Sequence, residues 1–312
     1  MDNDKRFQTQ DWDTDAVHQR IINEVEAASA PTPKKKHRKG KFNWKIYVAA
    51  VVLGSMLLAG IFNAPAMTGW ELLEGGIASV VIYIILILTG MLMGPLLRVP
   101  KPERKFYQLM TIFNNMGFIG YPVVNAVIGP EGMGFAALFN LGFNLLLFTY
   151  GIVLLRQGQV RVNWKTFLNA GTLSALLAIL LLLTRWTVPT PVVSCLSYMG
   201  NAMTFFASAI IGHSLARTSW KVVLENKKLY LFVALRYLLV PILLGLALKR
   251  VVSNELLLNV FVLLMAMPAA NMPLMMAQEY DMETDTLTGG IVLSTVCSIV
   301  TITVVATVVR ML

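Results

Sequence analysis

Two apolar segments each place an asparagine three residues after a proline, an arrangement that could bind a solute inside a membrane. One reads Pro122-Val-Val-Asn125 and the other reads Pro268-Ala-Ala-Asn271. Proline removes a backbone donor and frees the carbonyl one turn earlier, and a nearby amide can fill that gap or offer donors to a substrate. Either segment alone could be an ordinary proline kink. Because the two match, we favour a functional pair.

The first of these segments also carries Asn114 and Asn115, and a third apolar segment carries Arg236 about 12 Å from its basic end at 1.5 Å per residue. An arginine inside the membrane is expensive and indicates a functional site by default. Two interpretations of Arg236 stay open. It could pair with a substrate carboxylate and favour anions, or it could bond backbone carbonyls or reach the interface.

Other polar residues within apolar segments are weaker candidates. Asn201 and Thr204 begin one such segment, and His213 lies near its end. For His213 we expect a satisfied interfacial histidine rather than a ligand. We expect the serines and threonines of the last segment, such as Ser294 and Ser298, to pack helices.

The acidic residues all fall in the polar N-terminal segment, in loops or at the ends of apolar segments. Carboxylates within the membrane are the usual sign of proton relays and cation sites, so their absence favours an anion as the transported solute. The sequence contains no His-Glu-x-x-His motif and no candidate Ser-His-Asp triad. The cysteines, Cys195 and Cys297, have no metal-ligand spacing. We therefore expect no enzyme activity, no metal and no cofactor.

The composition predicts a protein that faces lipid. Hydrophobic residues make up 56% of the 312 residues, charged residues only 14%, and the mean hydropathy is +0.65. A soluble domain usually has about 25% charged residues. The net charge of +9 does not indicate a nucleic-acid partner, because ten of the 26 Lys and Arg lie in the first 45 residues and most others lie between apolar segments.

These elements predict an all-α polytopic membrane protein, because about 20 apolar residues span a bilayer and spanning segments must satisfy their backbone internally. We expect nine spans after a disordered, polar and basic cytoplasmic tail at 1–44. The first repeat would cover 45–155, a cytoplasmic loop 156–165 and the second repeat 166–312. The nine expected spans are 45–63, 76–97, 107–128, 133–155, 166–184, 192–215, 229–248, 255–278 and 286–309.

The loop charges predict the orientation. With the tail inside, the inner loops hold eleven Lys or Arg and the outer loops with the C-terminus hold four. Basic residues concentrate on the cytoplasmic side, so the N-terminus is expected in the cytoplasm and the C-terminus outside. The two Pro-x-x-Asn segments are five spans apart and would cross the membrane in opposite senses, as an inverted repeat requires.

These segments resemble the auxin efflux carrier family of membrane transporters, from about residue 77 to the end of the chain. The runs that carry the resemblance are Asn115-Met-Gly-Phe-Ile-Gly-Tyr-Pro122, Gly129-x-Glu-Gly132, Gly200-Asn201 with Thr204, Ile210-Ile-Gly212, Arg236 with Pro241, Ala266-Met-Pro268-Ala-Ala, and Leu293-Ser-Thr295 with Ser298. The family has ten helices, so the first repeat of this chain is expected to lack its first helix.

The resemblance implies two inverted repeats of about five helices, similar to bile acid–sodium symporters, whose broken helices cross at their prolines. Asn115, Pro122, Pro268 and Asn271 would then mark the substrate site. It also implies a permease of the bacterial cytoplasmic membrane, a homodimer that moves a small organic anion such as a dicarboxylate by an elevator-like mechanism. The alternative is a non-transporting membrane sensor or partner subunit derived from the same fold.

Overall fold

The structure is a computed structural model that describes a large part of the chain. It describes residues 58, 61–62, 67–156, 170–184, 189–199, 205, 212, 220–280 and 282–311. Contacts divide the chain into residues 1–43 and 44–312, and every described residue belongs to the second unit. The expected tail, nearly all of the expected span 45–63, and the candidates Asn201, Thr204 and His213 lie outside the described residues.

The described residues are helical, and an isolated pair, Asn114 and Ala269, forms the β-bridge among them. The α-helices are α3 (Gly69–Leu96), α4 (Arg104–Ile112), α5 (Tyr121–Val127), α6 (Met133–Leu146), α7 (Ile152–Leu155), α8 (Ala170–Thr184), α10 (Trp220–Glu225), α11 (Lys227–Ala234), α12 (Val240–Leu248), α13 (Glu255–Met265), α14 (Met272–Glu279) and α15 (Asp285–Met311). Of three π-helical turns, η2 (Met116–Gly120) leads into α5, η4 (Leu147–Gly151) joins α6 to α7, and η6 (Leu235–Leu239) joins α11 to α12. The 3-10 turns at Lys101–Glu103 (η1) and Pro130–Gly132 (η3) precede α4 and α6.

Four helical stretches are long and apolar enough to cross a membrane. They are Gly69–Leu96, Pro130–Leu155, Lys227–Leu248 and Asp285–Val308. They agree with the expected spans at 76–97, 133–155, 229–248 and 286–309. The expected spans at 107–128 and 255–278 are each interrupted. Their longer apolar helices are Met116–Val127 and Glu255–Met265. The described part of the chain is therefore that of a multi-pass membrane protein.

Helix α3 shows how the sequence makes a lipid-facing helix. It starts at a capping box in which Thr68 accepts a hydrogen bond from the Glu71 amide and the Glu71 carboxylate accepts one from the Thr68 amide. Large apolar side chains recur every three or four residues along an exposed face, including Leu73, Ile77 and Ile84. The opposite face is buried. In water this pattern would be costly, whereas in a bilayer the exposed stripe contacts acyl chains.

Both ends of α3 hydrogen-bond to the second half of the chain. At its start, Glu74 Oε1 accepts from the Ser253 amide at 3.0 Å. Beyond its end, the Arg98 carbonyl accepts from Lys228 Nζ at 2.7 Å. Near the first contact, Gly75 lies close to Leu257 of α13. Two segments far apart in the sequence are thus tied together at both ends of the same helix.

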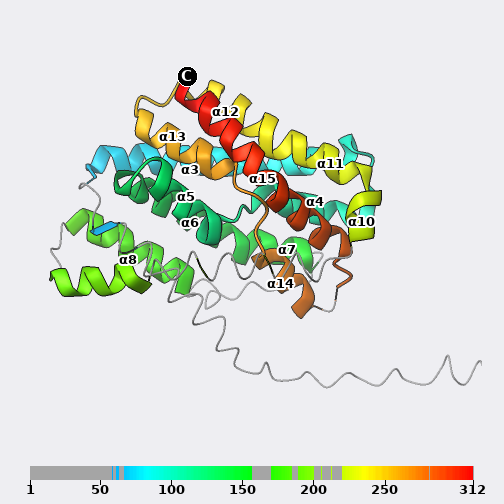
Figure 1. The fold of residues 1–312 in the computed structure, drawn as a ribbon, viewed down its shortest axis with the longest axis horizontal. Helices are drawn as coiled ribbons and strands as arrows, with labels where there is room; N and C mark the ends of the chain where they lie inside the picture. Colours follow the sequence, from blue (N-terminus) through cyan, green and yellow to red (C-terminus); the bar gives the residue numbers. More distant parts are fainter. Residues whose placement is uncertain are drawn as a thin grey trace, which may run out of the picture. The chain divides into compact units, whose positions relative to one another are not determined.

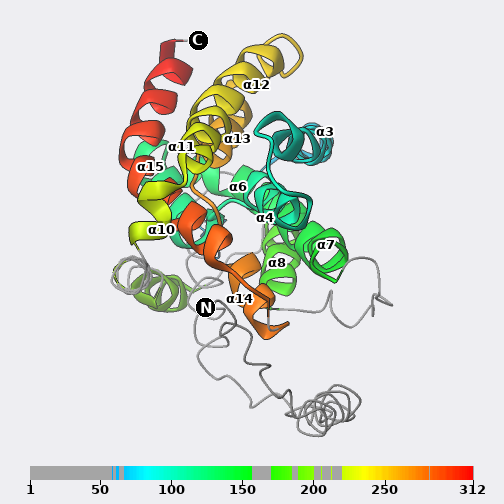
Figure 2. The same cartoon turned by 90° about the vertical axis from the view of Figure 1, so that its right-hand side faces the viewer.

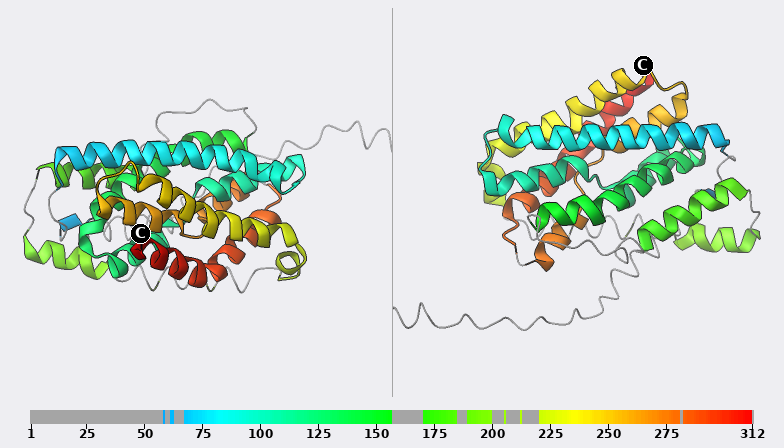
Figure 3. Two further views of the ribbon diagram at one scale, coloured as in Figure 1. Left: turned by 90° about the horizontal axis from the view of Figure 1, so that it is seen from above. Right: turned by 180° about the vertical axis from the view of Figure 1, so that it is seen from behind.

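The interrupted helices lie in the middle of this arrangement. Figures 1, 2 and 3 show α3 and α15 on opposite sides of the bundle, with α12 and α13 between them and α4 and α6 beneath. Aromatic rings fill the space between α3, α6 and α13. Phe139 stacks on Tyr83 with a centroid distance of 4.9 Å and packs against Phe261 at 4.8 Å.

Two of the π-helical turns have a common cause. The turn Met116–Gly120 ends two residues before Pro122, and the turn Leu235–Leu239 ends two residues before Pro241. A proline removes a donor, and its ring clashes with the carbonyl four residues earlier. Widening the preceding turn relieves the clash without ending the helix. Pro122 therefore lies within a continuous helical stretch, from Met116 to Val127, and not at a break.

Candidate functional site at the crossing of two broken helices

The two interrupted helices cross as short extended segments that pair through their backbones. Helix α4 ends at Ile112, and the chain becomes helical again at Met116, whereas α13 ends at Met265 and α14 begins at Met272. The Asn115 amide donates to the Pro268 carbonyl at 2.7 Å, and the Ala270 amide donates to the Phe113 carbonyl at 2.9 Å. We call the segments 113–115 and 266–271 the crossing.

Each break leaves carbonyls of the preceding helix without their usual partners, four residues on. At the end of α4, the Thr111 carbonyl would accept from the Asn115 amide, which is used across the crossing. It accepts instead from Arg236 Nε at 2.6 Å. The Met110 carbonyl accepts from the Tyr237 hydroxyl at 2.7 Å. Both replacement donors come from the π-helical turn between α11 and α12.

The end of α13 is satisfied in the same way by side chains. In a continuous helix the Leu264 carbonyl would accept from the amide of residue 268, which is a proline and has none. The Leu264 carbonyl accepts instead from Asn114 Nδ2 at 3.0 Å and from the Met267 amide at 3.3 Å. The Met265 carbonyl accepts from Asn114 Nδ2 at 3.2 Å and from an Arg236 terminal nitrogen at 3.0 Å. The Ala269 amide donates to Ser294 Oγ of α15 at 3.2 Å.

Arg236 joins both breaks from one side. Its side chain is 0% exposed. The remaining terminal nitrogen donates to Asn114 Oδ1 at 2.9 Å, and the guanidinium lies 5.0 Å from the centroid of the Tyr237 ring. Its acceptors are all neutral. The geometry therefore places the guanidinium on two backbone carbonyls and an amide oxygen, in line with the interpretation in which Arg236 bonds carbonyls.

The other two asparagines of the crossing, Asn115 and Asn271, keep side-chain donors that no described residue accepts from, and Asn115 is 4% exposed. Asn115 is the N-cap of the helix that starts at Met116, and its Oδ1 accepts from the Phe118 amide at 3.3 Å. Its Nδ2 donates to no described residue. Asn271 is the N-cap of α14, but its half-buried side chain makes no capping bond there. Helix N-termini carry a partial positive charge and bind anions.

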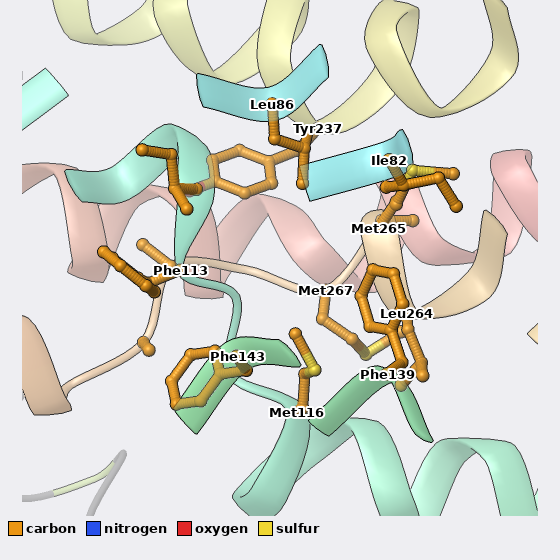
Figure 4. Packing of buried hydrophobic residues seen from close by; sticks show 14 of the residues in the cluster. Ile82, Leu86, Phe113, Met116, Phe139, Phe143, Tyr237, Leu264, Met265 and Met267 are labelled. Carbon is orange, nitrogen blue, oxygen red and sulfur yellow. The ribbon is translucent and has the colours of Figure 1, made fainter. Parts of the chain in front are cut away.

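An apolar side completes the crossing. Figure 4 shows Phe113 and Met267, from the two extended segments, together with Phe143 and Met116 below them in the view. The Phe113 and Phe143 rings meet edge to face with a centroid distance of 5.5 Å. These side chains are at most 8% exposed. They exclude water and so strengthen the hydrogen bonds made at the polar side.

The structure brings together most, but not all, of the residues that the sequence singled out. Asn114, Asn115, Pro268 and Asn271 lie at the crossing, and Arg236 contacts it. Two residues lie outside it. They are Pro122 and Asn125. Asn125 is exposed and lies about 15 Å along the helix from Asn115, at 1.5 Å per residue.

The expectation that both helices break at their prolines is therefore wrong for Pro122. The wide turn before Pro122 absorbs the proline, and the break lies at residues 113–115 instead. The two Pro-x-x-Asn motifs do not occupy equivalent places. Asn114 pairs with Ala269 across the crossing, so the asparagines before Pro122 and the residues after Pro268 are the ones that meet.

Three polar residues outside the crossing, Tyr237, Ser294 and Tyr121, were not assigned to the site from the sequence. Tyr237 was missed, although its position beside Arg236 and before Pro241 was a usable signal. Ser294 was expected to pack helices, and it accepts the Ala269 amide. The Tyr121 hydroxyl is buried near Asn140 but makes no hydrogen bond of normal geometry with a described residue. Such an orphaned polar atom in the middle of a membrane protein is a candidate ligand contact.

Membrane transporters often contain broken helices at the middle of the membrane, and the sequence comparison places this chain among them. The chain matches the membrane transport protein family over residues 46–163 and 157–306, and each stretch contains one broken helix. The chain belongs to this family, the auxin efflux carriers. No protein of curated function matches the chain.

Proposed function

We propose that this auxin efflux carrier family member is a secondary carrier of a small organic anion, such as a dicarboxylate. The observation that carries the proposal is that each broken helix resumes at the crossing behind an asparagine, Asn115 before Met116 and Asn271 before Met272, whose amide N–H groups donate to no described residue. The N-termini favour negative charge, and the amide N–H groups of Asn115 and Asn271 can donate to carboxylate oxygens.

The described acidic residues support an anion rather than a cation. They are Glu71, Glu74, Glu103, Glu131, Glu225, Glu255, Glu279, Glu283 and Asp285, and all lie in loops or near helix ends. No group of three or more acidic, histidine or cysteine side chains that could hold a metal ion occurs in the described part of the chain. A cation would therefore find carbonyl and amide oxygens at the crossing but no carboxylate.

The crossing also supports an elevator-like mechanism. Backbone hydrogen bonds, Asn114 and Arg236 hold the two broken helices together. A site built on such a unit moves with it rather than coming apart. We further propose a homodimer in the bacterial cytoplasmic membrane, with the N-terminus inside and the C-terminus outside. The eleven basic residues of the expected inner loops, against four outside, support this orientation.

Uptake into proteoliposomes tests the function. The full chain should take up labelled malate or malonate with saturable kinetics. Asn115→Ala and Asn271→Ala should each lower kcat/KM at least about tenfold, as expected when a hydrogen bond of more than about 1.4 kcal/mol to a charged group is lost. Asn125→Ala removes the same amide from an exposed position and should change uptake less than about twofold.

Two results would overturn the proposal that the protein is a carrier. Absence of saturable flux for every dicarboxylate tested is the first, and full flux after both Asn115 and Asn271 have been replaced is the second. The non-transporting alternative has its own signature. A dicarboxylate at about 100 times its Kd would stabilise the protein by about 2.7 kcal/mol while producing no flux.

A further inference from the structure

Arg236 is a buried cation that no described carboxylate balances. Its three nitrogens donate to the carbonyls of Thr111 and Met265 and to the amide oxygen of Asn114. These acceptors are neutral. They satisfy the N–H donors of the guanidinium and partly stabilise its charge, but neutral groups cannot cancel a unit of charge. In a water-poor interior that charge acts over a longer range than it would at a surface.

The position of this charge relative to the crossing is what gives it a role. Arg236 bonds to Asn114, and the next residue is Asn115, the N-cap of the half-helix that begins at Met116. Consecutive Cα atoms are about 3.8 Å apart. The charge therefore lies one residue from Asn115, where a ligand of the crossing would bind. Full burial of Arg236 prevents direct contact with that ligand.

We propose that Arg236 determines the charge selectivity of the crossing without touching the substrate. This inference rests on the proposed function, because it assigns the transported anion as the counter-charge of Arg236. The same side chain holds the two breaks in register through the carbonyls of Thr111 and Met265. Arg236 is thus a positioning residue whose charge, and not only its hydrogen bonds, shapes the site.

The expected size of the effect follows from Coulomb's law. At an effective dielectric constant of about 20, a unit charge about 8 Å from a carboxylate changes the affinity about 30-fold. The factor applies to each negative charge of the ligand. A dianion should therefore lose more affinity than a monoanion of similar shape when the charge of Arg236 is removed. A purely structural role would weaken both ligands equally.

The experiment compares labelled succinate with labelled monomethyl succinate, using the full chain in proteoliposomes. Arg236→Gln removes the charge and Arg236→Lys keeps it. We expect Arg236→Gln to raise the KM of succinate about 30-fold more than that of the monoester, and Arg236→Lys to preserve the ratio of the two KM values while lowering kcat. Lys227→Gln removes an exposed charge from the start of the same helical stretch and should leave both KM values unchanged.

A second variant covers the case in which Arg236→Gln does not fold. Ser294→Asp adds a carboxylate at the position that already accepts the Ala269 amide, and it should also weaken succinate more than the monoester. The inference is overturned if charge-removing and charge-preserving variants change the two KM values by the same factor. It is also overturned if Arg236→Lys alone abolishes the difference between the ligands.

Ligand-induced thermal stabilisation in detergent separates this inference from the proposed carrier. One outcome is that the wild-type protein shows no flux, that succinate stabilises it more than the monoester does, and that Arg236→Gln removes that difference. The proposed carrier function then fails, and the inference about Arg236 holds. If the protein transports both ligands with equal KM values before and after substitution, the carrier holds and the inference fails. Absence of both flux and stabilisation overturns both.

Discussion

Replacing Asn114 with alanine tests whether side chains really take the place of the missing backbone donors. Asn114 makes three hydrogen bonds at the crossing, to the carbonyls of Leu264 and Met265 and from Arg236. It is 0% exposed. The substitution therefore leaves the Leu264 carbonyl, four residues before Pro268, with the Met267 amide alone at 3.3 Å, and it takes an acceptor from a buried cation.

The magnitude can be worked from these bonds. Hydrogen bonds between transmembrane helices average about 0.6 kcal/mol, and a bond to a charged group contributes about 1.5–3 kcal/mol. Two bonds of the first kind and one of the second give a loss of about 3 kcal/mol. Asn144 is a matched control, because it is 7% exposed and donates once, to the Asn140 carbonyl of its own helix at 2.9 Å. We expect Asn144→Ala to cost about 1 kcal/mol.

The assay is unfolding of the detergent-solubilised protein by increasing fractions of sodium dodecyl sulfate, followed by circular dichroism. A double-mutant cycle of Asn114→Ala with Arg236→Met should return a coupling of about 2 kcal/mol, because the two side chains are in direct contact. The reasoning is refuted if Asn114→Ala and Asn144→Ala lower the free energy of unfolding by the same amount, or if the coupling is zero.

Three further predictions concern the proline, an orphaned hydroxyl and a close helix contact. Pro268→Ala supplies an amide that competes with Asn114 for the Leu264 carbonyl and should lower dicarboxylate flux at least about tenfold without unfolding the protein. Pro273→Ala, near the start of α14, is the control and should keep the flux, because a residue in the first turn of a helix donates no helical hydrogen bond. Tyr121→Phe removes a buried hydroxyl that lacks a normal hydrogen bond. It should raise the free energy of unfolding by about 1 kcal/mol and also raise the KM for the dicarboxylate. An unchanged KM would exclude contact between this hydroxyl and the substrate. Gly132→Ala places a methyl 2.9 Å from Val260 and 3.0 Å from Val124 and should lower the free energy of unfolding by about 1–3 kcal/mol. Gly76→Ala, whose methyl would have no atom within 4 Å, should stabilise α3 by about 0.5–1 kcal/mol. Equal melting temperatures for the two variants would contradict this packing.

The sequence predicted the membrane class and most of the elements for direct physical reasons. An uninterrupted apolar run of about 20 residues has the length and composition of a transmembrane helix. The four continuous helices of the described residues lie where such runs predicted them. The auxin efflux carrier resemblance is also confirmed, because the chain matches the membrane transport protein family over residues 46–163 and 157–306. Asn115, Pro268 and Asn271 could be selected as site candidates, since polar residues and prolines stand out against an apolar background.

The tertiary structure decided which of these residues meet and what each one does. The sequence could not tell a proline that breaks a helix, Pro268, from one that only widens a turn, Pro122, because the difference depends on whether a partner can satisfy the freed carbonyls. Asn114 supplies that partner for the Leu264 carbonyl from 150 residues away. The role of Arg236 was open in the sequence for the same reason, since its three acceptors come from segments far apart in the chain. A polar residue in an apolar run marks where a site can be, and only the folded backbone shows whether that residue faces the substrate or holds the break together.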